Sequence, residues 1–295
     1  MQSLSRKSEA KLSAITQSEF NAQLISLWLH HNKSQHTQRV YGQDIREFLA
    51  FVGDCPLHEV TYMAAQEYQE NLVSRGLAPR TINRKIHALR SLLTFGCEKV
   101  RMLTTNVGLV LGSEKVANDL ARRILTEEQV FKMFALETNH RNGLILRTLY
   151  YTGLRVSEIA SLKWKDLQPR GEHDGQAIVF GKGGKTRIVL VSEKVWRSLM
   201  ELRADAASDA PVFESGKGGH LDPSQVFRIV RAAAKRAGIE GNVSPHWLRH
   251  SHASHAMDRG APLHVVQASL GHSNPATTGR YLHARPGDGS GRYLC

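Results

Sequence analysis

Cysteine is scarce in this sequence, with three residues among 295: Cys55, Cys97 and Cys295. Their number is odd, they lie far apart, and no two form a Cys-x-x-Cys pair, which excludes a disulfide framework and gives no support to a structural zinc site. No apolar run approaches the ~18 residues that a membrane span requires. Residues 1–10 also lack the apolar core of a signal peptide. These absences predict a cytoplasmic protein that does not enter a membrane.

Acidic residues are in the minority, with 27 Asp and Glu against 39 Lys and Arg, for a formal net charge of +12. Hydrophobic residues make up 41% and charged residues 22%, which is typical of a globular chain rather than a disordered one. A chain this basic usually binds a polyanion, and nucleic acid is the first candidate. A merely basic enzyme surface is the alternative. The length is enough for about two domains.

Strand-like alternation is absent before residue 110, where apolar side chains such as Leu24 and Trp28 recur at helical spacing. Further along, "TEEQ" at Thr126 matches a helix capping box. Residues 177–191, "AIVFGKGGKTRIVLV", alternate on either side of a glycine-rich turn and predict a β-hairpin. The predicted organisation is a flexible arm at 1–15, an all-helical domain at 16–110, a linker at 111–123, an α+β domain at 124–285 and a flexible tail at 286–295. The predicted fold class is mainly α with a small β-hairpin or sheet.

Basic residues gather in one helix of the first domain. Between Arg75 and Arg101 there are seven Lys or Arg and one acid, Glu98. Arg80, Arg84 and the neighbouring Lys85 lie about one turn apart and can face one way. A helix with one basic face suits a DNA groove or its flanking phosphates, although a solvated charged face is the alternative. The predicted DNA-binding residues are Arg80, Arg84, Lys85 and Arg90.

Two motifs of the second domain place basic residues at turns. In "TGLRVSEIASLKW", Arg155 follows a helix break at Gly153 and can hold an anion, although a surface ion pair is the common alternative. The stretch "GKGGKTR" at 181–187 is not a phosphate-binding P-loop, because the first glycine of that pattern would fall on Val179. We interpret it as a hairpin tip that presents Lys182, with Lys185 nearby. A solvated turn lysine is equally compatible with the sequence.

The stretch "HWLRHSHASH" at 246–255 contains four histidines. It has no His-Glu-x-x-His motif, no cysteine pair and no carboxylate at ligand spacing, which argues against zinc. His252 and His255 share a helix face with Leu248, which favours packing or hydrogen bonding for both. His246 and Arg249, three residues apart, can project together from the start of a helix. Further on, His272 follows Gly271, and Tyr281 lies nine residues later.

Together these motifs resemble those of the tyrosine recombinases, also called phage-type integrases, and most closely their Xer-like branch. "TGLRVSE" resembles the first-arginine motif, "GKGGKTR" the lysine hairpin, "SPHWLRHSHASH" the His-x-x-Arg motif, "LGHS" the second-histidine motif and "TTGRYLH" the nucleophile motif. The resemblance runs from Ile124 to His283. More loosely, "HTQRVYGQDIREF" and "APRTINRKIHALRSLL" resemble the family's DNA-clamping region. His252 departs from the family, which usually has an apolar aromatic residue there.

The resemblance implies a reaction at a DNA phosphodiester. Arg155 and Arg249 would bind its two non-bridging oxygens, and His272 would donate a hydrogen bond to the same phosphate. Tyr281 would attack phosphorus, forming a 3′-phosphotyrosyl bond and releasing a 5′-hydroxyl. No metal and no nucleotide cofactor would be needed, because the covalent bond conserves the phosphodiester energy.

Roles for the remaining site residues follow from the same resemblance. His246 would accept the tyrosine proton, and Lys182 would protonate the leaving oxygen. Glu158, one turn after Arg155, would orient that arginine or a histidine. We expect His250 and His255 to make supporting hydrogen bonds and His252 to pack.

The implied partners are double-stranded DNA with a specific recombination site and further copies of the chain, assembled as a tetramer on two duplexes. Two alternatives remain at this stage. A type IB topoisomerase shares the chemistry but relaxes DNA without exchanging strands between duplexes. A non-catalytic DNA-binding regulator would bind DNA without forming a covalent adduct.

Overall fold

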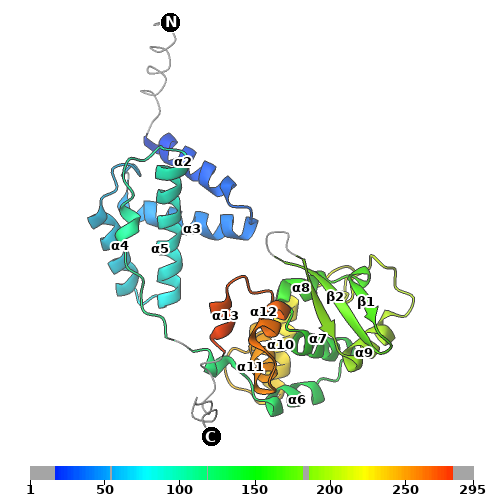
Figure 1. Ribbon diagram of the computed structural model, residues 1–295. Helices are drawn as coiled ribbons and strands as arrows, with labels where there is room; N and C mark the ends of the chain where they lie inside the picture. The colour runs from blue at the N-terminus through cyan, green and yellow to red at the C-terminus, as the bar shows by residue number, and fades with distance from the viewer. Residues whose placement is uncertain (1–16, 54, 118, 182–185, 282–295) are drawn as a thin grey trace, which may run out of the picture. The chain divides into compact units, whose positions relative to one another are not determined.

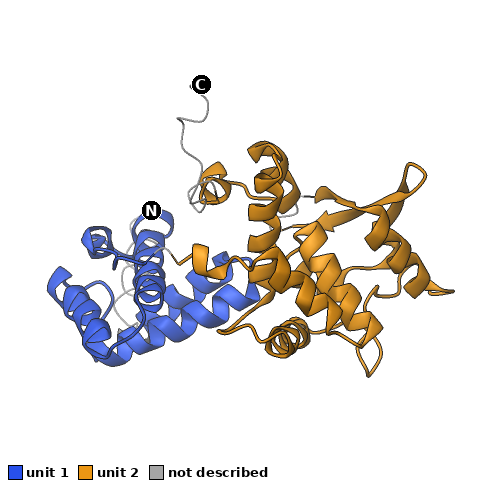
Figure 2. Ribbon diagram, turned by 90° about the horizontal axis from the view of Figure 1, so that it is seen from below, with its two compact units in different colours: residues 1–117 blue, residues 118–295 orange. Residues whose placement is uncertain are grey.

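The chain divides into two compact units, residues 1–117 and 118–295 (Figure 1, Figure 2). The break falls inside the segment predicted as a linker. The predicted arm, the predicted tail and Lys182 lie outside the described residues. The computed structural model describes residues 17–53, 55–117, 119–181 and 186–281.

Unit 1 is all-helical within these residues, and unit 2 combines helices with one small sheet, which confirms the predicted fold class. The helices of unit 1 are α2 (Gln17–His31), α3 (Gln35–Val52), α4 (Tyr62–Ser74) and α5 (Pro79–Thr94), followed by the short η1 (Phe95–Lys99) and η2 (Val107–Val110).

Local sequence sets where these helices begin. The hydroxyl of Ser34 accepts a hydrogen bond from the backbone N–H of Thr37, and Thr61 does the same for Ala64. Pro79 occupies the first turn of α5, where its missing N–H costs nothing. The buried side of α5 follows helical spacing and packs against α3 and α4. Large side chains such as Trp28 and Phe48 fill the core of unit 1.

A buried ion pair joins α3 to α5 and involves one of the residues predicted to bind DNA. Asp44 is 2% exposed and Lys85 is 7% exposed. The ammonium of Lys85 lies 3.1 Å from Asp44 Oδ1 and 2.6 Å from Glu47 Oε2. Arg84 pairs with the other oxygen of Asp44. Lys85 therefore does not present its charge on an outer face, because it lies on the side of α5 that packs against α3.

Unit 2 holds a three-stranded antiparallel sheet in the order β1-β2-β3, with Ile178 of β2 opposite Ile188 of β3. The sheet contacts α7 and α9, and α7 also packs against α11 (Figure 1). Within the described residues, no helix has both the length and the apolar character to cross a bilayer. The elements are η3 (Ala121–Arg123), α6 (Glu127–Ala135), α7 (His140–Thr152), α8 (Val156–Ser161), η4 (Trp164–Asp166), β1 (Leu167–Arg170), β2 (Asp174–Phe180), β3 (Thr186–Val191), α9 (Glu193–Arg203), α10 (Pro223–Arg236), α11 (Pro245–Asp258), α12 (Leu263–Leu270) and α13 (Pro275–Gly279).

The buried pair between α3 and α5 gives a prediction for stability. Lys85→Ala leaves Asp44 and Glu47 with less positive charge in a buried place, so the free energy of unfolding should fall by about 3 kcal/mol. Lys33→Ala, at an exposed lysine of the same unit, should change it by less than about 0.5 kcal/mol. Urea unfolding followed by circular dichroism measures both, and equal effects would show that the pair contributes nothing.

Candidate active site

Two glycine-terminated helices bring distant parts of unit 2 together. Helix α7 ends at Gly153 and α12 ends at Gly271, each with a φ of 63° that favours glycine. Arg155 follows the first end and begins α8, and His272 follows the second. Nη2 of Arg155 donates to the carbonyl of Gly271 at 2.9 Å. The two helix ends thus place Arg155 beside His272.

Arg249 on α11 binds both of these helix ends. Its side chain is buried, and its two terminal nitrogens donate to the carbonyls of Gly153 and Leu270. Among the described residues, no carboxylate pairs with it. Burial and the positive charge of Arg155 lower the pKa of Arg249 to about 10, so it is still protonated at neutral pH. The site therefore holds a buried cation with only carbonyl oxygens as direct partners.

Glu158 on α8 binds two arginines at once. It accepts from the backbone N–H of Arg155 at 2.7 Å and from Arg155 Nη1 at 2.8 Å. Both its oxygens also accept from Arg187 on β3, each at 2.7 Å. Burial alone would raise the pKa of Glu158, but the hydrogen bonds from Arg187 and Arg155 outweigh it and lower the pKa to about 2. Glu158 therefore orients Arg155, as predicted, and remains ionised.

Tyr281 is buried at 3% exposure and its hydroxyl lies 2.6 Å from Nδ1 of His250. Burial raises the pKa of Tyr281, so the free hydroxyl is protonated at neutral pH. Burial and the neighbouring His246 lower the pKa of His250 to about 4. His246 lies one turn before His250, with ring centroids 6.2 Å apart. It is His250, not His246, that contacts the tyrosine hydroxyl.

His272 is held by a hydroxyl of α13. Its Nδ1 lies 2.8 Å from Oγ1 of Thr278. Burial and the positive charges of Arg249 and Arg155 lower the pKa of His272 to about 4, so the ring is neutral at neutral pH. If the hydroxyl of Thr278 donates to Nδ1, the proton of the ring is on Nε2 and is available to an acceptor in the cavity.

The remaining histidines of α11 behave as the sequence predicts. Nδ1 of His255 lies 2.9 Å from the hydroxyl of Tyr150, which confirms a supporting hydrogen bond. The ring of His252 packs closely against Gly153. A methyl group added at Gly153 would lie 2.7 Å from this ring. Among the described residues, no three His, Cys, Asp or Glu are grouped to hold a metal ion.

The predicted catalytic residues that lie within the described part of the chain meet around one cavity of about 190 Å³. A wider cleft of about 890 Å³ shares Arg155 and His272 with it and reaches Phe180 and Thr186 at the ends of β2 and β3. The smaller cavity is lined by Leu120, Arg155, His246, Arg249, His250, His272, Thr277, Arg280 and Tyr281. Tyr281 thus faces a common space with three arginines and three histidines.

Comparison with known proteins decides the family. Residues 123–287 match the Phage integrase family, and residues 20–99 match the Phage integrase N-terminal SAM-like domain. The chain belongs to the phage integrase family of tyrosine recombinases. Members of this family cleave and rejoin DNA.

Relatives of similar length support the same placement. A tyrosine recombinase of Thermosipho africanus (strain TCF52B) is 34% identical over 275 residues, which cover 88% of this chain and 94% of that protein. Tyrosine recombinase XerD of Chlorobaculum tepidum (strain ATCC 49652 / DSM 12025 / NBRC 103806 / TLS) is 35% identical over 273 residues, covering 87% and 88%.

Solved structures show the same fold. A lambda integrase dimer bound to a COC′ core site has a TM-score of 0.73 at 18% identity and covers 92% of this chain and 97% of its own. XerH bound to a palindromic difH substrate has a TM-score of 0.70 at 20% identity, covering 92% and 82%.

The basic residues predicted to bind DNA have different surroundings in the recombinase. Arg80 is exposed, whereas Arg84 is 40% exposed and pairs with Asp44. Lys85 is buried in its ion pair. Arg90 donates to the carbonyls of Gly108 and Gly112, each at 3.1 Å, and so holds the segment that contains η2. Two of the four side chains therefore serve the fold of unit 1.

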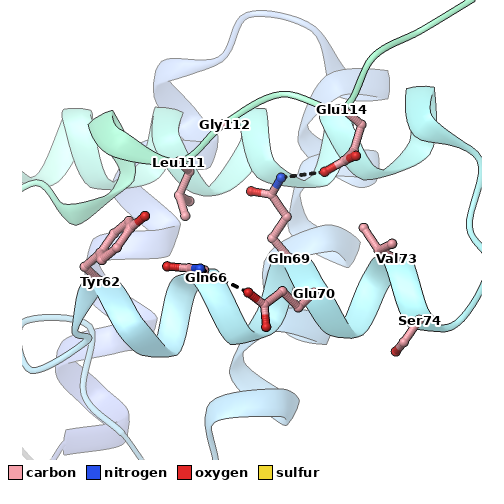
Figure 3. A pocket seen from close by; sticks show the side chains of 9 residues that line it. All are labelled: Tyr62, Gln66, Gln69, Glu70, Val73, Ser74, Leu111, Gly112 and Glu114. Atoms are coloured by element: carbon pink, nitrogen blue, oxygen red, sulfur yellow. Dashed lines mark hydrogen bonds between the residues drawn. The ribbon is translucent and has the colours of Figure 1, made fainter.

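Acidic side chains line a groove on another side of unit 1. A groove of about 450 Å³ lies between α4 and the segment after η2 (Figure 3). Gln66 donates to Glu70, and Gln69 donates to Glu114 across the groove. Its lining includes two carboxylates and no basic residue, which is unfavourable for a phosphate backbone.

Sequence reasoning missed one residue of the site and one contact. Arg187 ends the motif "GKGGKTR" but was not singled out, because nothing in the spacing shows that β3 passes beside α8. The His250–Tyr281 contact joins residues 31 positions apart, so no local pattern could reveal it. The sequence predicted a supporting hydrogen bond for His250 but not that its partner is Tyr281.

Proposed function

We propose that the recombinase exchanges DNA strands at a specific site through a 3′-phosphotyrosyl intermediate on Tyr281. The observation that carries the proposal is the common cavity of Tyr281, Arg155, Arg249 and His272. A phosphodiester in this cavity would lie beside a nucleophile and beside two cations at once. The phosphotyrosyl bond conserves the energy of the phosphodiester, so rejoining needs neither a metal nor a nucleotide.

Charge supports the roles of the arginines. Arg155, Arg187 and Arg249 with the ionised Glu158 form a group with a net charge of +2. The pentacoordinate transition state of a phosphodiester attacked by a phenolate carries two negative charges. Fixed cations that match a developing charge lower the barrier without needing to reorganise. Arg155 and Arg249 would bind the non-bridging oxygens, and Nε2 of His272 would donate to one of them.

The tyrosine proton would pass to a histidine. The sequence assigned this role to His246, but the contact at 2.6 Å favours His250 as the immediate acceptor. A histidine with a pKa of about 4 is a weak base. A bound phosphate would raise the pKa of His250, because its negative charge stabilises the imidazolium. Proton transfer would therefore accompany attack on phosphorus. His246, one turn before His250, would share the positive charge that His250 gains.

Lys182 would protonate the 5′-oxygen as it leaves. It lies outside the described residues, but the strand ends that flank its hairpin, Phe180 and Thr186, line the same cleft as Arg155. In the sequence Lys182 lies between these two strand ends, which makes it the candidate for the acid.

The DNA partner would lie against unit 1 on the outer sides of α3 and α5. Arg80 and Arg84 on α5 would contact phosphates, together with Arg39 and Arg46, which are exposed on α3. A lambda integrase structure with a TM-score of 0.70 is a tetramer bound to a Holliday junction. We extend this assembly to the present chain as a tetramer on two duplexes. A DNA substrate would place the reaction in the compartment that holds the DNA, the cytoplasm in bacteria.

Two-site exchange tests this function. The target site is first found by sequencing genomic DNA ends that become covalently attached to the protein. A plasmid with two copies of that site should then yield exchanged products with the wild-type chain. Tyr281→Phe should yield none while its DNA affinity stays nearly intact. Relaxation of the plasmid without exchange would instead indicate a topoisomerase, and binding without any adduct a regulator.

The proton acceptor gives a separate prediction. On a nicked substrate that traps the adduct, His250→Ala should slow adduct formation by on the order of 10²–10⁴, the range for a lost general base. Without the base, the tyrosine must ionise by itself. Burial raises the pKa of the Tyr281 hydroxyl above its ordinary value, so the rate of the variant should rise about tenfold per pH unit from pH 7 to pH 9.

His246→Ala is the matched comparison, since both histidines lie on the same side of α11. It should be slowed with little rise in rate at high pH. If the pH-dependent recovery appears in His246→Ala and is absent from His250→Ala, the acceptor is His246, as the family resemblance implies.

A further inference from the structure

Arg187 lines the wider cleft together with Arg155 and His272, and all three nitrogens of its guanidinium make hydrogen bonds. Nη1 and Nη2 each donate to one oxygen of Glu158 at 2.7 Å, and Nε donates to the carbonyl of Ser269 at 2.8 Å. Its side chain is 12% exposed. Three of its five N–H donors are used in this way and its side chain is mostly covered, so Arg187 is placed to hold Glu158 and Ser269 rather than a phosphate.

Arg155 and His272, two of the residues proposed to bind the phosphate, are called the phosphate clamp below. The partners of Arg187 are the groups that hold these two residues. Glu158 receives the backbone and side chain of Arg155, and Arg155 donates its other nitrogen to Gly271. Ser269 and Gly271 belong to the end of α12, directly before His272. Arg187 therefore contacts both the carboxylate that orients Arg155 and the backbone that places His272.

The close approach of Arg187 to the end of α12 depends on Gly271. A methyl group added at Gly271 would lie 2.8 Å from Cδ of Arg187 and 3.1 Å from its Nε. The φ of 63° also favours glycine there. The backbone at Gly271 thus leaves room for the guanidinium that crosses from β3 to α8.

Electrostatics shows what Arg187 changes at Arg155. A single carboxylate shared by two arginines cannot neutralise both, so part of the charge of Arg155 remains available to a substrate. Without Arg187, Glu158 would have Arg155 as its one remaining side-chain partner and would form a closed ion pair with it. The net charge of the group would also fall from +2 to +1.

We propose that Arg187 is a positioning residue for the phosphate clamp, acting through Glu158 on Arg155 and through the end of α12 on His272. The inference rests on the proposed function, since it assigns the clamp to the DNA phosphate. It adds that strand β3 is tied to Arg155, because Arg187 of β3 and Arg155 both bind Glu158.

The test compares two substrates that differ in charge. Nicked DNA is prepared with either a normal phosphodiester or a neutral methylphosphonate at the cleaved position, and single-turnover adduct formation is measured. Arg187→Ala should slow cleavage of the phosphodiester by about 10- to 100-fold, the scale for losing the outer partner of a functional group. DNA affinity should stay nearly unchanged. The loss should be much smaller on the methylphosphonate, whose transition state carries one negative charge less.

A double-mutant cycle separates an indirect role from an independent one. Arg155→Ala should lose on the order of 10²–10³ in rate on the phosphodiester. If Arg187 acts through Arg155, the variant with both substitutions should be only slightly slower than Arg155→Ala. Arg187→Lys keeps the charge but cannot bind both oxygens of Glu158, so its rate should lie between Arg187→Ala and wild type. Arg197→Ala, at an arginine of α9 whose side chain is 69% exposed, should behave as wild type.

Each result bears on the inference in a defined way. Near-normal cleavage by Arg187→Ala would overturn it, as would equal losses on both substrates with multiplicative effects in the cycle. If Arg187→Ala fails to fold, Arg187→Lys decides by the same comparison of substrates. Failure of the wild-type chain to form any adduct would instead contradict the proposed function, and the inference with it.

Discussion

The buried guanidinium of Arg249 is the constraint on which the site depends. A cation that is 4% exposed requires compensation, and no described carboxylate pairs with it. Its direct partners are the carbonyls of Gly153 and Leu270, which lie at the C-terminal ends of α7 and α12. Unpaired carbonyls at a helix C-terminus carry partial negative charge, which stabilises a nearby cation. Two helix ends must therefore converge on one residue of α11.

This convergence places the other functional groups. The chain that leaves α7 begins α8 with Arg155, and the chain that leaves α12 continues with His272. Glycine at both helix ends allows the left-handed turns that these exits need. Burial, and after it the nearby positive charges, lower the pKa values of His250 and His272, so neutral rings surround the cations. The result is a cavity that lacks a negative charge and is suited to a phosphate.

Much of the site could be predicted from the sequence, because its motifs are local. Arg155, Arg249, His272 and Tyr281 each lie in a short recognisable stretch, and the structure brings all four to one cavity. Contacts between distant segments could not be predicted in this way. Arg187 binds Glu158 across 29 positions and His250 reaches Tyr281 across 31, and both depend on how whole elements pack.

Two features of the fold escaped the sequence for other physical reasons. The basic cluster of α5 suggested one charged face, but spacing alone cannot show that Asp44 of α3 lies opposite Lys85 and draws it into the interior. The third strand, β1, has only four residues and contains Pro169. So short a run shows no alternation, and proline is tolerated there because β1 lies at the edge of the sheet.

The chemical identity of the trapped adduct tests the central claim most directly. Wild-type protein is captured on a nicked substrate, digested with protease and nuclease, and the modified peptide is identified by mass. If Tyr281 is the nucleophile, the peptide carries a nucleotide joined through its 3′-phosphate to Tyr281. An adduct on another residue, such as Tyr293, or one joined through a 5′-phosphate, would contradict it.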